Sequence, residues 1–86
     1  MKIRDTYILR TVAGENLVVK VGSSVNFNSV ITLNDTGKFL WEKLIQENTA
    51  NDLIDALLCE YDVDRQTAER DVATFIEKLK AKDILE

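Results

Sequence analysis

Few side chains in this sequence could take part in covalent chemistry. Cys59 is the only cysteine and histidine is absent, so the chain lacks the Cys-His and Ser-His pairs that activate nucleophiles. One cysteine cannot form a cysteine-rich metal site or an internal disulfide. Gly14, Gly22 and Gly37 are the only glycines, and their spacing fits neither a phosphate-binding loop nor a dinucleotide fingerprint. The inventory predicts a protein that is not an enzyme and that uses no metal or cofactor.

The remaining candidates for chemistry have simpler structural explanations. Cys59 lies among Leu57, Leu58 and Tyr61, so we expect a buried thiol of low reactivity. Between Thr49 and Asp64 the chain carries five acidic residues and no Lys or Arg. Such a run is usually a solvated face, and the alternative is a docking surface for a basic partner.

The charge distribution argues against a partner that is bound through phosphates. The net charge is −4, with six basic and five acidic residues over 1–48 but five basic and ten acidic over 49–86. Affinity for nucleic acid comes largely from Lys and Arg that release counterions. We therefore expect no nucleic-acid partner.

Length and composition limit the organisation of the chain. Its 86 residues, 45% hydrophobic and 30% charged, predict one domain over 1–86. No apolar run approaches the roughly 20 residues that span a bilayer, and the first residues lack the apolar core of a signal peptide. A cytoplasmic protein without membrane contact is expected.

The first third of the chain has the pattern of β-strands. Residues 7–12 and 17–21 are rich in β-branched and aromatic side chains, and residues 13–16 between them have the length of a hairpin connection. Residues 28–33 predict a third strand, with Ile31 and Leu33 on one face.

Three helices follow. Asn34 is a good N-cap, and Leu40, Trp41, Leu44 and Ile45 form an apolar stripe in a helix that should end near residues 47–48. Thr49 and Asp52 match a capping box before a second, shorter helix. Asp64 is the next N-cap, for a third helix of about 18 residues, after which Ile84 and Leu85 should fold back onto the body.

Three strands followed by three helices predict an α+β fold with a three-stranded antiparallel sheet, and the last two helices form a helix-turn-helix pair. The architecture is therefore winged helix-turn-helix-like. The first functional alternative for such a fold is a DNA-binding regulator. However, Arg65 and Arg70 are the only basic residues in the first half of the third helix, and five acids precede them.

The second alternative is recognition of a peptide that adds as a strand to the sheet edge. Soluble proteins usually protect a free edge with Pro, Lys or another charge, and residues 28–33 contain none of these. The same pattern would also arise if this strand were central or if the third helix covered its edge.

A longer stretch of the sequence helps to decide between DNA binding and peptide binding. The run from Ile31 to Leu44, with Leu-Asn-Asp-Thr-Gly leading into a helix that carries Leu40 and Trp41, resembles the PqqD family, named for coenzyme PQQ synthesis protein D. Residues 60–85 are similar to the second and third helices of that family. One departure is Lys82-Asp83, where relatives often have a glycine that ends the helix.

The resemblance implies a RiPP recognition element, which is a non-catalytic peptide chaperone. Such a module binds the leader region of a ribosomally synthesised precursor peptide and presents it to a modifying enzyme, often a radical SAM maturase. The leader would add to the third strand and lie between it and the third helix. The peptide-binding residues that this implies are Asn28, Ser29, Val30, Ile31 and Thr32 on the strand and, on the helix, whichever of Val72, Ala73, Ile76 and Lys80 face the cleft. The alternative for Val72 and Ile76 is the core, because apolar residues at helical spacing are more often core than pocket.

Overall fold

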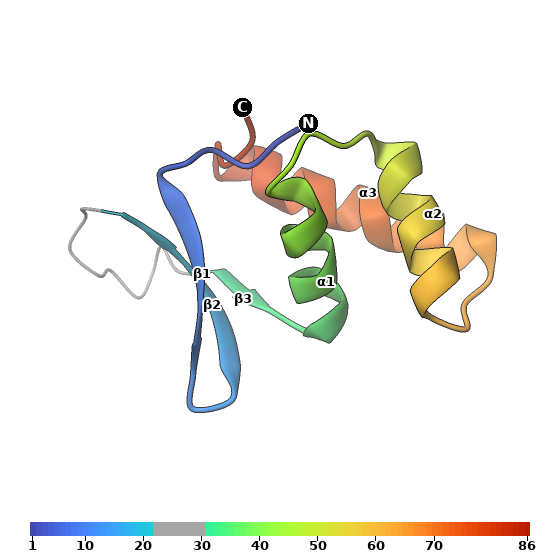
Figure 1. Ribbon diagram of the computed structural model, residues 1–86, viewed down its shortest axis with the longest axis horizontal. Coiled ribbons are helices and arrows are strands. Elements are labelled where there is room, and N and C mark those ends of the chain that lie inside the picture. The colour runs from blue at the N-terminus through green and yellow to red at the C-terminus, as the bar shows by residue number, and fades with distance from the viewer. Residues whose placement is uncertain (22–30) are drawn as a thin grey trace.

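A computed structural model of the chain describes residues 1–21 and 31–86. The first two strands, β1 (Tyr7–Val12) and β2 (Glu15–Lys20), form an antiparallel hairpin. The third strand, β3 (Ile31–Leu33), pairs antiparallel with β2, which gives the sheet order β1-β2-β3. Three helices follow in sequence: α1 (Asp35–Leu44), α2 (Ala50–Glu60) and α3 (Arg65–Ala81) (Figure 1). The predicted α+β, winged helix-turn-helix-like order is confirmed.

The hairpin differs from its prediction at the turn. Glu15 and Asn16 belong to β2, so the connection is the two residues Ala13 and Gly14 and not four. Both have positive φ, 52° and 82°, which is the backbone of a type I′ turn. The prediction missed this turn because alanine rarely adopts the left-handed region.

Helix starts follow the predicted capping residues. The Asn34 side chain accepts a hydrogen bond from the Gly37 amide over 2.8 Å. At the start of α2, Thr49 and Asp52 form the predicted reciprocal capping box. The Asp64 carboxylate accepts from the Thr67 amide over 2.7 Å at the start of α3. The caps therefore satisfy backbone donors that the helices cannot satisfy internally.

The end of α1 comes earlier than predicted. The helix stops at Leu44, and Ile45, which was assigned to the apolar stripe, is its C-cap and is 56% exposed. The Asn48 side-chain amide donates to the Lys43 carbonyl over 2.6 Å. This bond satisfies one of the carbonyls that a helix end leaves free, so the chain can turn towards α2.

The end of α3 has an aspartate at the position where helices most often have a glycine. Asp83 has φ of 56°, and aspartate tolerates this left-handed conformation better than most residues. The Ile84 amide donates to Leu79 and the Asp83 amide donates to Lys80, both over 3.0 Å. These are the two bonds of a Schellman motif, and Leu79 and Ile84, the positions at which this motif usually has a hydrophobic contact, are both buried.

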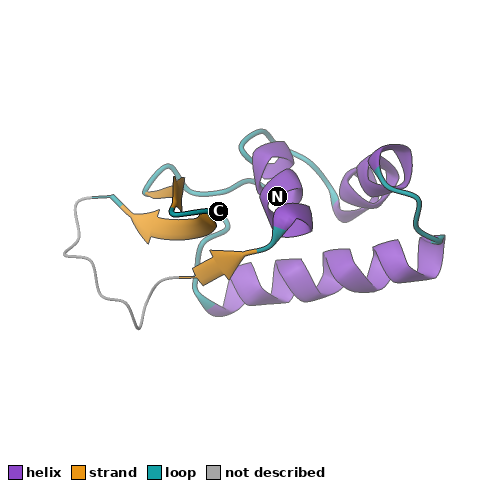
Figure 2. Ribbon diagram, turned by 90° about the horizontal axis from the view of Figure 1, so that it is seen from below, coloured by secondary structure: helices purple, strands orange, loops and turns teal. Residues whose placement is uncertain are grey.

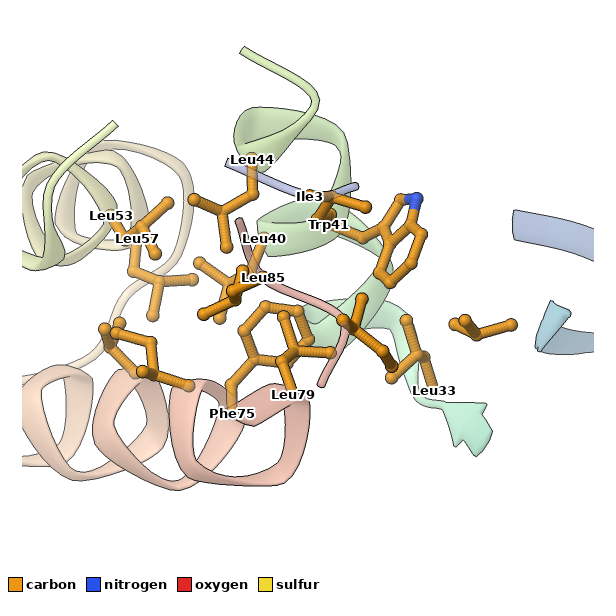
Figure 3. Packing of buried hydrophobic residues seen from close by; sticks show 14 of the residues in the cluster. Ile3, Leu33, Leu40, Trp41, Leu44, Leu53, Leu57, Phe75, Leu79 and Leu85 are labelled. Atoms are coloured by element: carbon orange, nitrogen blue, oxygen red, sulfur yellow. The ribbon is translucent and has the colours of Figure 1, made fainter. Parts of the chain in front are cut away.

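One hydrophobic core joins the sheet to all three helices. Trp41, as predicted, is buried and lies beside Ile3, while Leu53 and Leu57 of α2 point towards Leu44 and Leu40 of α1 (Figure 3). The two ends of the described chain close the core, because Ile3 forms an isolated antiparallel bridge with Leu85. None of the helices in residues 1–21 and 31–86 is long and apolar enough to cross a membrane.

Replacing Ala13 by asparagine should stabilise the hairpin. Asparagine tolerates positive φ, so Ala13→Asn should relieve backbone strain and raise the free energy of unfolding by about 0.5 to 1 kcal/mol. Thermal unfolding followed by circular dichroism measures this change. The β-branched variant Ala13→Val should lower the melting temperature, and an asparagine variant no more stable than the wild type would contradict the turn assignment.

The stability of α3 should depend on pH through Asp64. The hydrogen bonds from Thr67, and to a smaller extent the charge of Arg70, lower the pKa of the Asp64 carboxyl below its ordinary value of 3.8. A lowered pKa in the folded state stabilises the fold above the ordinary pKa, and this contribution is lost as the pH falls through the folded-state pKa. Asp64→Asn keeps a capping oxygen but cannot titrate, so denaturant unfolding between pH 6 and pH 2 should show a shallower acid-induced loss. Parallel curves for the two proteins would refute this assignment.

Candidate functional site

The outer edge of β3 is open in the described part of the chain. The strand pairs with β2 on one side, and no other strand of residues 1–21 and 31–86 pairs with it on the other. Ile31 and Leu33 are buried, whereas Thr32 between them is exposed, which confirms the predicted alternation for these residues. The open side faces towards α3 (Figure 2).

A cleft of about 640 Å³ lies between this strand and α3, and we call it the β3–α3 cleft. Strand and turn residues form one wall, the first turns of α1 form the end, and one face of α3 forms the other wall. The strand and turn residues are Glu15, Thr32, Leu33 and Asn34. The α1 residues are Thr36, Gly37 and Leu40, and the α3 residues are Arg70, Asp71, Thr74, Phe75 and Lys78.

The floor of the cleft is apolar and its rim is polar. Leu33, Leu40 and Phe75 all belong to the core and also line the cleft. Figure 3 shows Phe75 pointing from α3 towards Leu40. Exposed groups surround this floor, among them Thr32 and Lys78. An apolar floor with a polar rim favours a ligand that buries an apolar side chain and keeps polar groups at the edges.

Residues near the end of β3 explain why the strand wall of the cleft has a fixed position. Gly37 lies in the first turn of α1, where an added Cβ would be 3.2 Å from the Cβ of Leu33. Asn16, which is buried, donates from its side-chain amide to the Leu33 carbonyl over 3.2 Å. These two contacts fix the end of β3 against the sheet and against α1.

The predicted strand residues lie partly within the described chain. Asn28, Ser29 and Val30 lie outside the described residues. Ile31 is buried on the inner face of β3, and Thr32 lines the cleft.

The predicted helix residues do not lie on the cleft. Val72 is 1% exposed and Ile76 is 8% exposed, and both belong to the hydrophobic core. Ala73 and Lys80 are exposed but are not among the residues that line the cleft. Their contact with a peptide stays a prediction. The face of α3 that borders the cleft is the one that carries Thr74 and Lys78, and sequence reasoning missed it.

Other candidates from the sequence have no site around them. Cys59 is exposed, contrary to prediction, because it lies about 200° around the helix from the buried Leu57. No group of three or more metal-ligating side chains occurs in the part of the chain that the structure describes. Arg65 faces the carboxylates of Asp55, at 3.8 Å, and Glu69, at 3.4 Å.

Comparison with known proteins identifies the family. The model of the family described as Coenzyme PQQ synthesis protein D (PqqD) matches residues 7–85. The chain therefore belongs to the PqqD family, as the resemblance predicted. A search of curated proteins finds no match.

Two solved structures have the same fold. TbiB1, in complex with the TbiA(beta) leader peptide, has a TM-score of 0.77 and 29% identity, and the match covers 100% of this chain and 95% of TbiB1. A lasso peptide synthetase B1, complexed with the leader peptide, has a TM-score of 0.75 and 24% identity over 99% of this chain and 95% of that one. The similarity therefore extends over the whole fold, including β3 and α3.

Alanine substitutions should separate core from cleft on α3. Val72→Ala should lower the free energy of unfolding by about 2 kcal/mol, because it removes buried apolar volume. Thr74→Ala changes an exposed side chain and should stay within about 0.5 kcal/mol of the wild type. Urea unfolding measures both. Equal effects would show that the two side chains are not on different faces of α3.

Proposed function

We propose that this protein binds the leader region of a ribosomally synthesised precursor peptide in the β3–α3 cleft. The observation that carries the proposal is the open edge of β3 beside an apolar-floored cleft. Membership of the PqqD family and the likeness to TbiB1, whose structure contains a leader peptide, support it. The peptide would add as a strand to β3 and place alternate side chains in the cleft.

The free energies of the individual contacts indicate moderate, reversible binding of the peptide. Main-chain hydrogen bonds to an edge strand contribute about 1 kcal/mol each after exchange with water. An apolar side chain that buries about 100 Å² on the floor adds about 2.5 kcal/mol. Ordering a flexible peptide costs about 2 to 5 kcal/mol, so micromolar affinity requires two or three such apolar contacts in addition to the main-chain bonds.

The role we infer is non-catalytic presentation of the peptide to a modifying enzyme. A radical SAM maturase is our proposal for that enzyme, because the PqqD resemblance implies it. We expect both to meet in the cytoplasm, where an exposed thiol such as that of Cys59 stays reduced. The DNA-binding alternative has no observation in its favour, and one of the two cations early in α3, Arg65, is already beside two carboxylates.

A binding experiment tests the proposal. The ¹⁵N-labelled protein is titrated with a synthetic leader of the precursor peptide encoded beside its gene. We expect amide shifts in Ile31–Leu33 and on the cleft face of α3, and heat in isothermal titration at tens of micromolar. No shifts and no heat at these concentrations would refute the proposed function.

Filling the cleft should weaken that binding without unfolding the protein. Thr74→Trp places a large ring among the cleft residues, so leader affinity should fall at least about tenfold. Glu77→Trp, an equal change at an exposed position of α3 that does not line the cleft, should leave the affinity within about twofold. Ala73→Trp tests the helix face predicted from sequence. Loss of binding in Ala73→Trp but not in Thr74→Trp would show that the peptide binds to the face of α3 that carries Ala73.

A further inference from the structure

We propose that Lys78 makes the β3–α3 cleft selective for a peptide segment in which an apolar residue is followed, two positions later, by aspartate or glutamate. This inference rests on the proposed function and specifies its ligand. Three observations carry it: the charges on the helix wall of the cleft, the spacing of Phe75 and Lys78, and the relative direction of β3 and α3.

Lys78 is the cation of the helix wall that lies farther along α3, two turns beyond Arg70. It lines the cleft and is exposed, and within residues 1–21 and 31–86 no carboxylate forms an ion pair with it. Arg70 and Asp71, the other charged residues of this wall, are adjacent and opposite in sign, so their end of the cleft has little net charge. A ligand carboxylate is therefore attracted to the Lys78 end.

Glu15 is the remaining charged group of the cleft, and it lies on the sheet side. Its neighbour Asn16 is the register partner of Leu33. Glu15 therefore lies level with the residue that follows β3, beyond the end of the strand. Its carboxylate repels a ligand carboxylate from that end of the cleft, which favours the Lys78 end.

The spacing on α3 fits alternate residues of an extended peptide. Phe75 and Lys78 are three residues apart on one face, a rise of about 4.5 Å. Side chains on the same face of a strand are about 6.7 Å apart, and the flexible lysine side chain covers the difference. An apolar side chain over Phe75, against the floor of Leu33 and Leu40, therefore places the next side chain on that face near the Lys78 ammonium group.

The order of the two ligand residues follows from the arrangement of the elements. β3 and α3 run in roughly opposite directions (Figures 1 and 2). A peptide strand antiparallel to β3, the more stable pairing, therefore runs in the same direction as α3. It passes Phe75 before Lys78, which puts the apolar residue first and the acidic residue second.

A peptide selection tests this inference with a defined probe. A phage-displayed library of random dodecapeptides is selected on the immobilised full chain. Segments with an apolar residue two positions before an acidic residue should be enriched at least about threefold over segments in the reverse order, a factor in the range of a partly exposed ion pair. On Lys78→Glu, the preference should change to a basic residue at the second position.

The matched control is Lys82→Glu, which makes the same change at an exposed position of the chain that does not line the cleft. It should keep the acidic preference, and circular dichroism should show that both variants are folded. An acidic preference that survives in Lys78→Glu, enrichment of the reverse order, no charge preference, or no enriched peptide would each overturn the inference. The leader titration decides the proposed function separately, so shifts in the cleft without an acidic preference would remove only the inference about Lys78.

Discussion

The hydrogen bonds of the buried Asn16 side chain hold the short third strand in place, and the cleft depends on that strand. The side-chain oxygen accepts from the Thr11 hydroxyl on β1 over 3.0 Å, and the amide donates to the Leu33 carbonyl on β3 over 3.2 Å. One side chain thus links all three strands. A buried amide is stable only when its donors and acceptors are paired, so these bonds favour one position of β3 on the sheet. The strand can then keep its register although no other strand of residues 1–21 and 31–86 pairs with its outer edge.

The junction between β3 and α1 applies the second constraint. Asn34 ends the strand and caps the helix, and Gly37 brings the first turn of α1 into close contact with Leu33. A side chain at position 37 would need Leu33 to move, and Leu33 forms part of the cleft floor. The Leu-Asn-Asp-Thr-Gly run that carries the family resemblance is therefore the segment that shapes the cleft. Its local geometry, and not a catalytic group, explains its residue types.

Sequence patterns predicted the elements well where a local rule decides the structure. The three N-caps, the burial of Trp41 and the return of Ile84 and Leu85 all follow from short-range chemistry. The predictions failed where the backbone departs from its usual preferences. Alanine at position 13 does not signal a type I′ turn. Ile45 continues the apolar spacing of α1, but the helix has already ended.

The face of α3 that borders the cleft could not be read from the sequence for a different reason. Apolar spacing identifies the buried face of a helix, and for Val72 and Ile76 the sequence leaves open whether they face the core or a peptide. A recognition surface that must stay accessible in the free protein is instead built largely from polar residues at the border of that face. A hydrophobicity pattern therefore does not identify Thr74 and Lys78 as residues of the cleft. Only the packing of α3 against Leu33 and Leu40 shows which border faces β3.

This division of α3 lets stability and recognition change separately. Its inner face contributes Val72, Phe75 and Leu79 to the core that holds the domain together. Its cleft border adds exposed side chains that contribute little to folding and can change without unfolding the protein. Phe75 is the exception, because it serves both the core and the cleft floor. Under the proposed function, one fold can serve proteins that select different peptides, since backbone pairing at β3 would be common to all peptides and the residues at the border of α3 would not.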